Sequence, residues 1–250
     1  MFIGEFELYF PDQKVYFFSD QDSKLFYKYK TIIYESNIDF TSQYYSCLDK
    51  VNETYVITLN EDYILYDFVK INLVENCVDI LNKNHNLSFI RFHKGPNYTN
   101  INFQDNLFFF NSNHRHLYSQ TATLWRRLDL LELYKKAPKS FIGKQEKHKN
   151  NNVLCAEDEI DKICRMRKLK GLYSFYNEKK IGNHNYDSHV FPYLQSIIVK
   201  GKWNYKEYKS QLKVLMQKYK INEANREVFL TNYKDKIISF VKKIGLINEY

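Results

Sequence analysis

The sequence contains few glycines and prolines, which interrupt helices and strands, few cysteines, which can cross-link a chain, and few alanines. Its 250 residues include only 7 glycines, 4 prolines, 4 cysteines and 4 alanines. It has no run approaching the ~18–20 apolar residues of a membrane-spanning helix, and its first residues lack the basic and apolar regions of a signal peptide. We therefore expect a protein that is neither embedded in a membrane nor secreted. Because 44% of the residues are hydrophobic, the composition argues against a disordered chain.

The few cysteines are spaced too far apart to form a recognisable metal site. Cys47, Cys77, Cys155 and Cys164 include no CxxC pair, so the sequence predicts no zinc centre. In an intracellular protein, buried and reduced thiols are the first expectation. Disulfides formed late, within one molecule or between molecules, are the alternative.

Sequence signatures of catalysis are missing as well. The chain contains no GxxxxGK[ST] or GxGxxG phosphate loop and no GxSxG nucleophile motif. Surface positions explain His114 and His116, and a helix N-terminus explains the acidic run from Glu157 to Asp161. We predict no catalytic residue, no metal and no cofactor, and hence a protein that is not an enzyme.

What the sequence has in excess is tyrosine, phenylalanine, asparagine and lysine. There are 22 Tyr, 19 Phe, 25 Asn and 30 Lys, against 7 Arg. All four residue types have AT-rich codons, so part of the excess reflects an AT-rich genome. So many phenol groups exceed the need of one core, and we expect some at the surface, where tyrosine favours protein–protein contacts.

The charges are divided unevenly along the chain. Residues 1–125 carry 10 basic and 15 acidic side chains, a net charge of −5, whereas residues 126–250 carry 27 and 14, a net charge of +13. A molecule with this division can bind a polyanion through its basic end, or bind its own copies head to tail.

Hydrophobic periodicity predicts strands at the N-terminus. Over Phe2–Phe10, hydrophobic residues recur at every second position, which is the period of a half-buried strand. Similar patterns follow over Val15–Phe18 and Lys24–Tyr34. Turn residues between these segments favour an antiparallel meander. Short later strands are expected near Tyr55–Leu59 and Leu87–Phe92.

Apolar residues at three- and four-residue steps predict helices in the rest of the chain. The expected helices are Asp62–Leu81, Thr121–Lys136, Glu157–Lys170, Asn204–Tyr219 and Asn222–Ile244. The predicted fold class is therefore α+β, with a small N-terminal antiparallel β meander followed by a predominantly α-helical body. Residues 1–142 form a strand-rich region with helices, residues 143–152 a basic, Asn- and Lys-rich linker or hinge, and residues 153–250 a basic helical region.

Two basic stretches in the second half, with a preceding pair of arginines, are candidate contacts for phosphate groups. This predicted basic patch consists of Arg126, Arg127, Lys135, Lys136, Arg165, Arg167, Lys168 and Lys170. Aromatic side chains nearby could stack on bases. Solvated helix ends explain the same stretches, and so does a nuclear localisation signal.

The tyrosine-rich segments and the divided charge together resemble the polyhedrins, the matrix proteins of insect-virus occlusion bodies. The segments that carry the resemblance are Tyr27-Lys28-Tyr29, Tyr44-Tyr45 and Tyr205-Lys206-Glu207-Tyr208. The resemblance concerns length, tyrosine content and charge distribution over the whole chain, and no sequence motif is shared. The helical second half fits a nudivirus-type protein better than the β-rich baculovirus or cypovirus proteins. It implies a crystalline lattice, exchanged segments, intermolecular disulfides and dissolution in alkali.

The leading hypothesis is a non-enzymatic structural protein that self-assembles into an occlusion-body matrix around virions, in the host nucleus or cytoplasm. Its partners would be further copies of itself and the virion surface. The predicted lattice contacts are Tyr27, Tyr29, Tyr44, Tyr45, Trp203, Tyr205 and Tyr208. The alternative is a basic nucleic-acid-binding protein of an AT-rich viral or parasite genome. An enzyme without a local motif is the third hypothesis.

Overall fold

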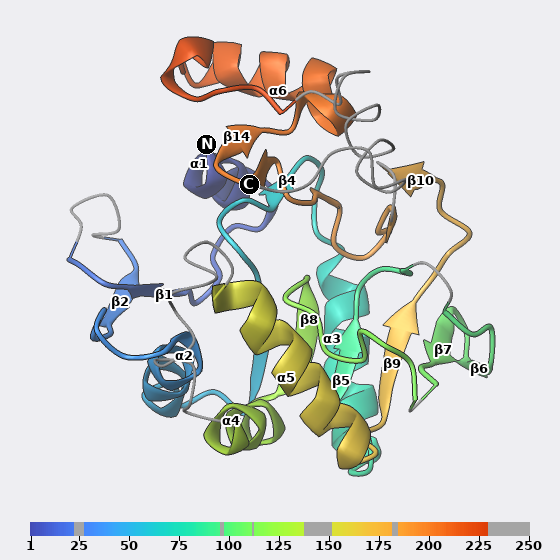
Figure 1. The fold of residues 1–250 in the computed structure, drawn as a ribbon. Coiled ribbons are helices and arrows are strands. Elements are labelled where there is room, and N and C mark those ends of the chain that lie inside the picture. Colours follow the sequence, from blue (N-terminus) through green and yellow to red (C-terminus); the bar gives the residue numbers. More distant parts are fainter. Residues whose placement is uncertain (23–27, 96–97, 112, 138–151, 182–184, 230–250) are drawn as a thin grey trace, which may run out of the picture.

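A mixed β-sheet of six strands forms the centre of the protein (Figure 1). The computed structural model describes residues 1–22, 28–95, 98–111, 113–137, 152–181 and 185–229. In spatial order, the strands are β3 (Tyr55–Thr58), β8 (Thr123–Arg126), β5 (Phe89–Arg91), β9 (Gly171–Ser174), β7 (Leu107–Phe109) and β6 (Asn102–Gln104). Only β5 and β9 are parallel neighbours. Segments from both sides of the predicted linker 143–152 therefore share one sheet, while the linker itself, apart from Asn152, lies outside the described residues.

Both faces of this sheet are covered by helices. Trp125 and its neighbours on one face pack against a group of three helices. These are α2 (Phe40–Asp49), α4 (Arg127–Lys136) and α5 (Asn152–Met166). Leu172 and its neighbours on the other face pack against α3 (Ile71–Lys83). Figure 1 shows α5 in front of the sheet and α3 behind it. Because successive side chains of a strand point to opposite faces, central strands between two helical layers are apolar on both.

A second group of elements lies beyond one end of the sheet, at the top of Figure 1. It comprises α1 (Phe2–Tyr9), β4 (Ile64–Leu65) paired with β12 (Tyr193–Leu194), the hairpin of β13 (Ile198–Val199) and β14 (Lys202–Trp203), α6 (Tyr205–Lys218) and the 3₁₀ helix η3 (Glu223–Asn225). Trp203, Tyr208 and Leu212 belong to the apolar core of this group. The remaining strands form two small pairs: β1 (Tyr16–Ser19) with β2 (Lys30–Ile33), and β10 (Lys180–Ile181) with β11 (Asn185–Tyr186).

Several predicted segments are confirmed. The expected helix Asn204–Tyr219 is α6, whose buried residues recur at three- and four-residue steps. The expected strands near Tyr55–Leu59 and Leu87–Phe92 are β3 and β5. Within the described ranges, no helix is both long and apolar enough to cross a membrane.

The predicted N-terminal meander is wrong. Phe2–Tyr9 is the helix α1, and the rings of Phe2, Phe6 and Phe10 contact one another in sequence, with centroids 5.9 and 5.5 Å apart. A spacing of four residues satisfies both a period of two and one helical turn, so the aromatic pattern could not distinguish a strand from a helix. The next two strands, β1 and β2, do form a pair, but it is parallel rather than antiparallel.

The predominantly helical body is also wrong, because strands occur throughout the chain. The segment expected to open a helix at Asp62 instead contributes β4, and α3 begins only at Ile71. The helix expected from Thr121 is preceded by β8 and begins at Arg127. These strands have two to four residues, which is too short to produce a clear period. The predicted last helix, Asn222–Ile244, has only η3 among the described residues.

Candidate nucleic-acid interface

Helix α6 presents a row of lysines on one of its sides. Lys209 and Lys213 lie one turn apart on the continuous part of the helix, Lys206 precedes a break in the helical backbone at Tyr208, and Lys220 follows the end of the helix with a φ of 51°. All four are exposed, and none forms an ion pair with a described residue. From Lys209 to Lys213, on the continuous part of the helix, the row is about 6 Å long at 1.5 Å per residue. We call these four residues the lysine face.

The rest of α6 is held firmly by its apolar side. Tyr208 and Leu212 are 2% and 0% exposed, in the core shared with α1 and the β13–β14 hairpin. Lys218 forms an ion pair with the buried carboxylate of Glu5 in α1, with 2.6 Å between Nζ and Oε1. Lys202 forms another with Glu227, at 2.5 Å. Two basic residues beside α6 are thus neutralised by described carboxylates, whereas the lysine face has no such partner among the described residues.

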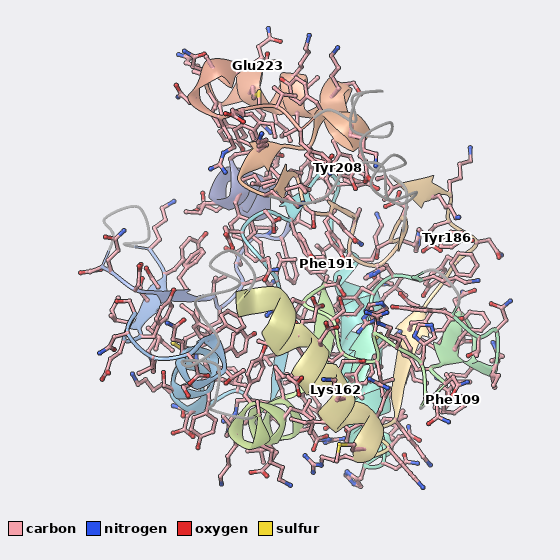
Figure 2. All side chains as sticks on the ribbon, viewed as in Figure 1. Phe109, Lys162, Tyr186, Phe191, Tyr208 and Glu223 are labelled. Atoms are coloured by element: carbon pink, nitrogen blue, oxygen red, sulfur yellow. The ribbon has the colours of Figure 1, made fainter. Side chains whose placement is uncertain are left out.

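A second surface combines lysines with aromatic rings. The Lys94 Nζ lies 4.3 Å from the ring centroid of Phe175 and 5.3 Å from that of Tyr186, and the Lys180 Nζ lies 5.7 Å from the latter. The two rings are 5.1 Å apart and nearly perpendicular. Figure 2 places Tyr186 at the outer edge of the molecule. Here the ammonium groups lie over half-buried rings, and cations and aromatic rings are the groups with which proteins contact the backbone and bases of single strands.

The predicted basic patch is not one surface in the structure. The Arg126 guanidinium donates to the Leu81 carbonyl at 2.7 Å and lies 3.7 Å from the Asp129 carboxylate. The Arg127 Nε donates to the Glu53 carbonyl at 3.0 Å. The next two members, Lys135 and Lys136, share the carboxylate of Glu132. The two arginines thus join elements of the fold, whereas the two lysines form exposed ion pairs within α4.

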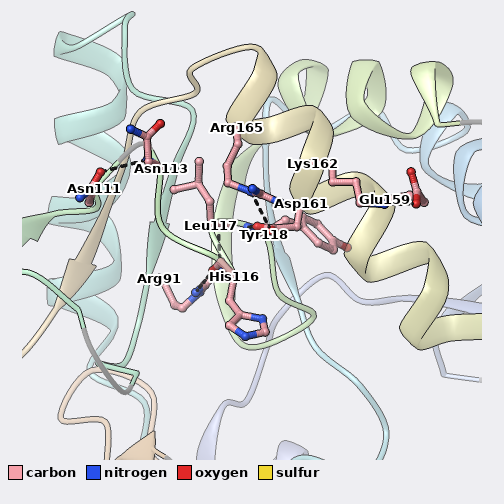
Figure 3. Close-up of polar contacts among 10 residues, drawn as sticks. All are labelled: Arg91, Asn111, Asn113, His116, Leu117, Tyr118, Glu159, Asp161, Lys162 and Arg165. Atoms are coloured by element: carbon pink, nitrogen blue, oxygen red, sulfur yellow. Dashed lines mark hydrogen bonds and ion pairs between the residues drawn. The ribbon is translucent and has the colours of Figure 1, made fainter.

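The members of the patch on and after α5 differ among themselves. Arg165 is paired with the buried carboxylate of Asp161, which also accepts the backbone N–H of Tyr118 (Figure 3). The last three members, Arg167, Lys168 and Lys170, are exposed and form no ion pair with a described residue. This short segment is the part of the predicted patch that is both exposed and without an ion pair to a described residue.

The residues predicted as lattice contacts lie mostly inside the chain. Trp203, Tyr205 and Tyr208 are 7%, 6% and 2% exposed. Tyr44 is stacked on Tyr134, with 4.2 Å between centroids. Of the others, Tyr29 donates to Glu7 at 2.9 Å, Tyr45 is half-buried against the helical layer, and Tyr27 lies outside the described residues. The interior thus uses many of the rings that the sequence suggested for contacts between copies.

The cysteines are distributed over separate parts of the core. Cys47, Cys77 and Cys164 are buried free thiols, and the side chain of Cys155 lies outside the described residues. Burial raises the pKa of the Cys77 and Cys164 thiols to about 12. At neutral pH both remain protonated, which makes them poor nucleophiles.

A buried polar centre was not identified from the sequence. Arg91 is fully buried and donates to the carbonyls of His116 and Leu117 at 3.1 and 3.0 Å (Figure 3). Nearby, the Nδ1 of buried His93 lies 3.0 Å from the hydroxyl of Tyr193, and burial, assisted by the charge of Arg91, lowers the pKa of His93 to about 3. Nothing in the local sequence distinguishes this arginine or this histidine from surface ones.

Comparison with known proteins adds no relative to this picture. No protein-family model matches the chain, and no curated protein matches it either. Among the described residues, no group of three or more His, Cys, Asp or Glu side chains is arranged to hold a metal ion. The lysine face on α6 is an exposed basic surface whose members form no ion pair with a described residue.

Proposed function

We propose that the protein binds nucleic acid without sequence specificity through the lysine face of α6. The observation that supports this proposal is the row of four exposed lysines without an ion pair to a described residue, on a helix whose other side is anchored in the core. Ammonium groups on flexible stems along an anchored helix suit a series of phosphates, which attract cations irrespective of base sequence. Arginine, the residue most often used to identify guanine, is absent from this face.

The expected affinity is modest and depends steeply on salt. Each phosphate contact contributes about 0.9 to the slope of log K against log salt on duplex DNA, so four lysines give a slope of roughly −3.6. Affinity should then fall about 150-fold between 50 and 200 mM salt. On single strands, where each contact contributes about 0.7, the slope should be roughly −2.8.

Self-assembly stays a prediction. The lysine face can contribute little free energy to association between copies of the chain. Lysine is depleted in protein–protein interfaces, and an exposed ion pair contributes only about 0–1 kcal/mol. Association costs at least about 4 kcal/mol before any affinity is seen. The aromatic rings that could supply the difference, such as Trp203 and Tyr208, are buried within the chain.

The proposal is tested by fluorescence anisotropy with labelled 20-nucleotide single-stranded and duplex DNA. The variant Lys209→Gln/Lys213→Gln removes two charges from the lysine face. The matched control Lys135→Gln/Lys136→Gln removes two equally exposed lysines from the end of α4, so the net charge of both variants is the same.

At 0.1 M salt we expect the first variant to bind duplex DNA about 60-fold more weakly, with the slope reduced by about 1.8, since each contact contributes a factor of roughly 8. The control should bind within about threefold of the unmodified protein. Equal losses in the two variants would show that net charge alone drives binding, and the absence of binding at 50 mM salt would refute the proposal.

A further inference from the structure

A cavity lies on the α3 side of the sheet, away from the lysine face. Its volume is about 600 Å³, and its walls come from α3, the turn between β6 and β7, the end of β9 and the segments that follow. The lining residues that matter for its chemistry are Asn76, Cys77, Asp79, Lys83, Asn84, Gln104, Asp105, Asn106 and Ser174. The size is within the range of small-molecule sites, which is roughly 300–1,000 Å³.

The lining combines an apolar floor with a rim rich in amides. Leu73, Ile80 and Leu107 supply apolar surface. The rim carries four side-chain amides, three of asparagine and one of glutamine, and each amide can both donate and accept hydrogen bonds. The charged side chains on the rim are two aspartates and one lysine, a net charge of −1. None of the three forms an ion pair with a described residue.

One buried hydroxyl of the cavity wall has no hydrogen-bond partner among the described residues. Ser174 is 1% exposed, and its Oγ makes no hydrogen bond to a described residue. It lies two residues after Leu172, so both side chains face the α3 side of the sheet, where the cavity is. By contrast, the buried hydroxyl of Ser188 donates to the Phe92 carbonyl. An unpaired buried hydroxyl is costly, and this cost is relieved when a polar group enters the cavity.

From these features we infer that the cavity binds a neutral small molecule whose ring carries neighbouring hydroxyl groups. Hydroxyls donate and accept, as the rim amides do, and the C–H face of such a ring suits the apolar floor. The net negative charge of the rim opposes phosphate and carboxylate groups. Two sources share this chemistry, a free monosaccharide and the ribose of a nucleoside, and the experiment distinguishes them.

The test is isothermal titration of the full chain with glucose, N-acetylglucosamine, uridine and adenosine, each up to 20 mM. We expect saturable one-to-one binding of at least one of them. Binding of the pyranoses alone identifies a monosaccharide site, and binding of the nucleosides alone identifies a nucleoside site. If none of the four shows saturable binding, the inference is overturned.

Variants then assign the bound molecule to this cavity. Asn76→Leu and Ser174→Ala should each weaken binding about threefold to tenfold, the loss expected for one hydrogen bond. The matched control is Asn72→Leu, one helical turn earlier on α3, where the asparagine is exposed and does not line the cavity. Melting temperatures establish that each variant is folded. Equal weakening by Asn72→Leu and Asn76→Leu would contradict the assignment, whatever the result for the lysine face.

Discussion

Replacing Arg91 should destabilise the protein more than replacing any other arginine of the chain. Its guanidinium is 0% exposed and donates to two backbone carbonyls, those of His116 and Leu117. It also donates to the hydroxyl of Tyr98 and lies over the ring of Phe110, with 4.9 Å between Cζ and the centroid. The arginine thus joins β5 to the segment that leads into β8.

The cost of Arg91→Ala follows from the groups that it leaves behind. Each of the two carbonyls loses a charged hydrogen bond worth about 1.5–3 kcal/mol, and the truncated side chain leaves a cavity. Part of this loss is offset because a buried cation no longer has to be desolvated. We expect the free energy of unfolding to fall by about 3–5 kcal/mol, which for a chain of this size lowers the melting temperature by roughly 6–15 °C.

The assay is urea unfolding followed by tryptophan fluorescence, with Arg167→Ala as the control. Arg167 is exposed and has no ion pair with a described residue, so its removal should change the unfolding free energy by less than about 0.5 kcal/mol. The reasoning is refuted if Arg91→Ala costs less than about 1 kcal/mol, because the two carbonyls would then be satisfied by other donors.

Three further outcomes follow from the buried polar groups and the tyrosines. Because the pKa of His93 is lowered to about 3, the unfolded chain binds its proton first, so stability should fall by about 1.4 kcal/mol per unit as pH drops from about 6.5 towards 3. In urea titrations, the free energy of unfolding should fall between pH 7 and pH 5, and His93 should account for about 2 kcal/mol of this fall. In His93→Gln the fall should be smaller by that amount, and an unchanged fall would contradict the assignment. Burial raises the pKa of Tyr208 and Tyr173 to about 12, so absorbance at 295 nm at pH 11 should report fewer than the full 22 phenolates until the chain is unfolded. Light scattering from pH 7 to 11, with and without reductant, examines self-assembly: large particles that dissolve near pH 10–11 would support the occlusion-matrix hypothesis, whereas a monomer at every pH would exclude it.

The elements that could be predicted from the sequence are those with a long and clear period. Helix α6 has one apolar side, and Lys209 and Lys213 lie one turn apart on an exposed side, so both its core and its exposed side are predictable from spacing. The lysine face was nevertheless overlooked in favour of denser basic runs such as Arg165–Lys170. Density along the chain is a poor guide because members of such a run can be neutralised within the fold, as Arg165 is by Asp161.

The elements that could not be predicted depend on partners distant in the chain. Strand β4 has two residues and exists because it pairs with β12, more than a hundred residues later. The aromatic spacing of α1 fits a strand equally well, and its packing beneath α6 is what the structure adds. The cavity beside Ser174 likewise requires α3, β7 and β9 to meet, which no local pattern records.

The sequence by itself determined the class of the protein, α+β, the core side of α6, the divided charge and the absence of catalytic motifs, because these depend on composition and local period. Tertiary structure alone decided which charges are free and which rings are exposed. A lysine with no ion pair to a described residue, such as Lys213, and an arginine bound by carbonyls, such as Arg91, look alike in a sequence. They differ only when the fold brings, or fails to bring, an acceptor within hydrogen-bonding distance.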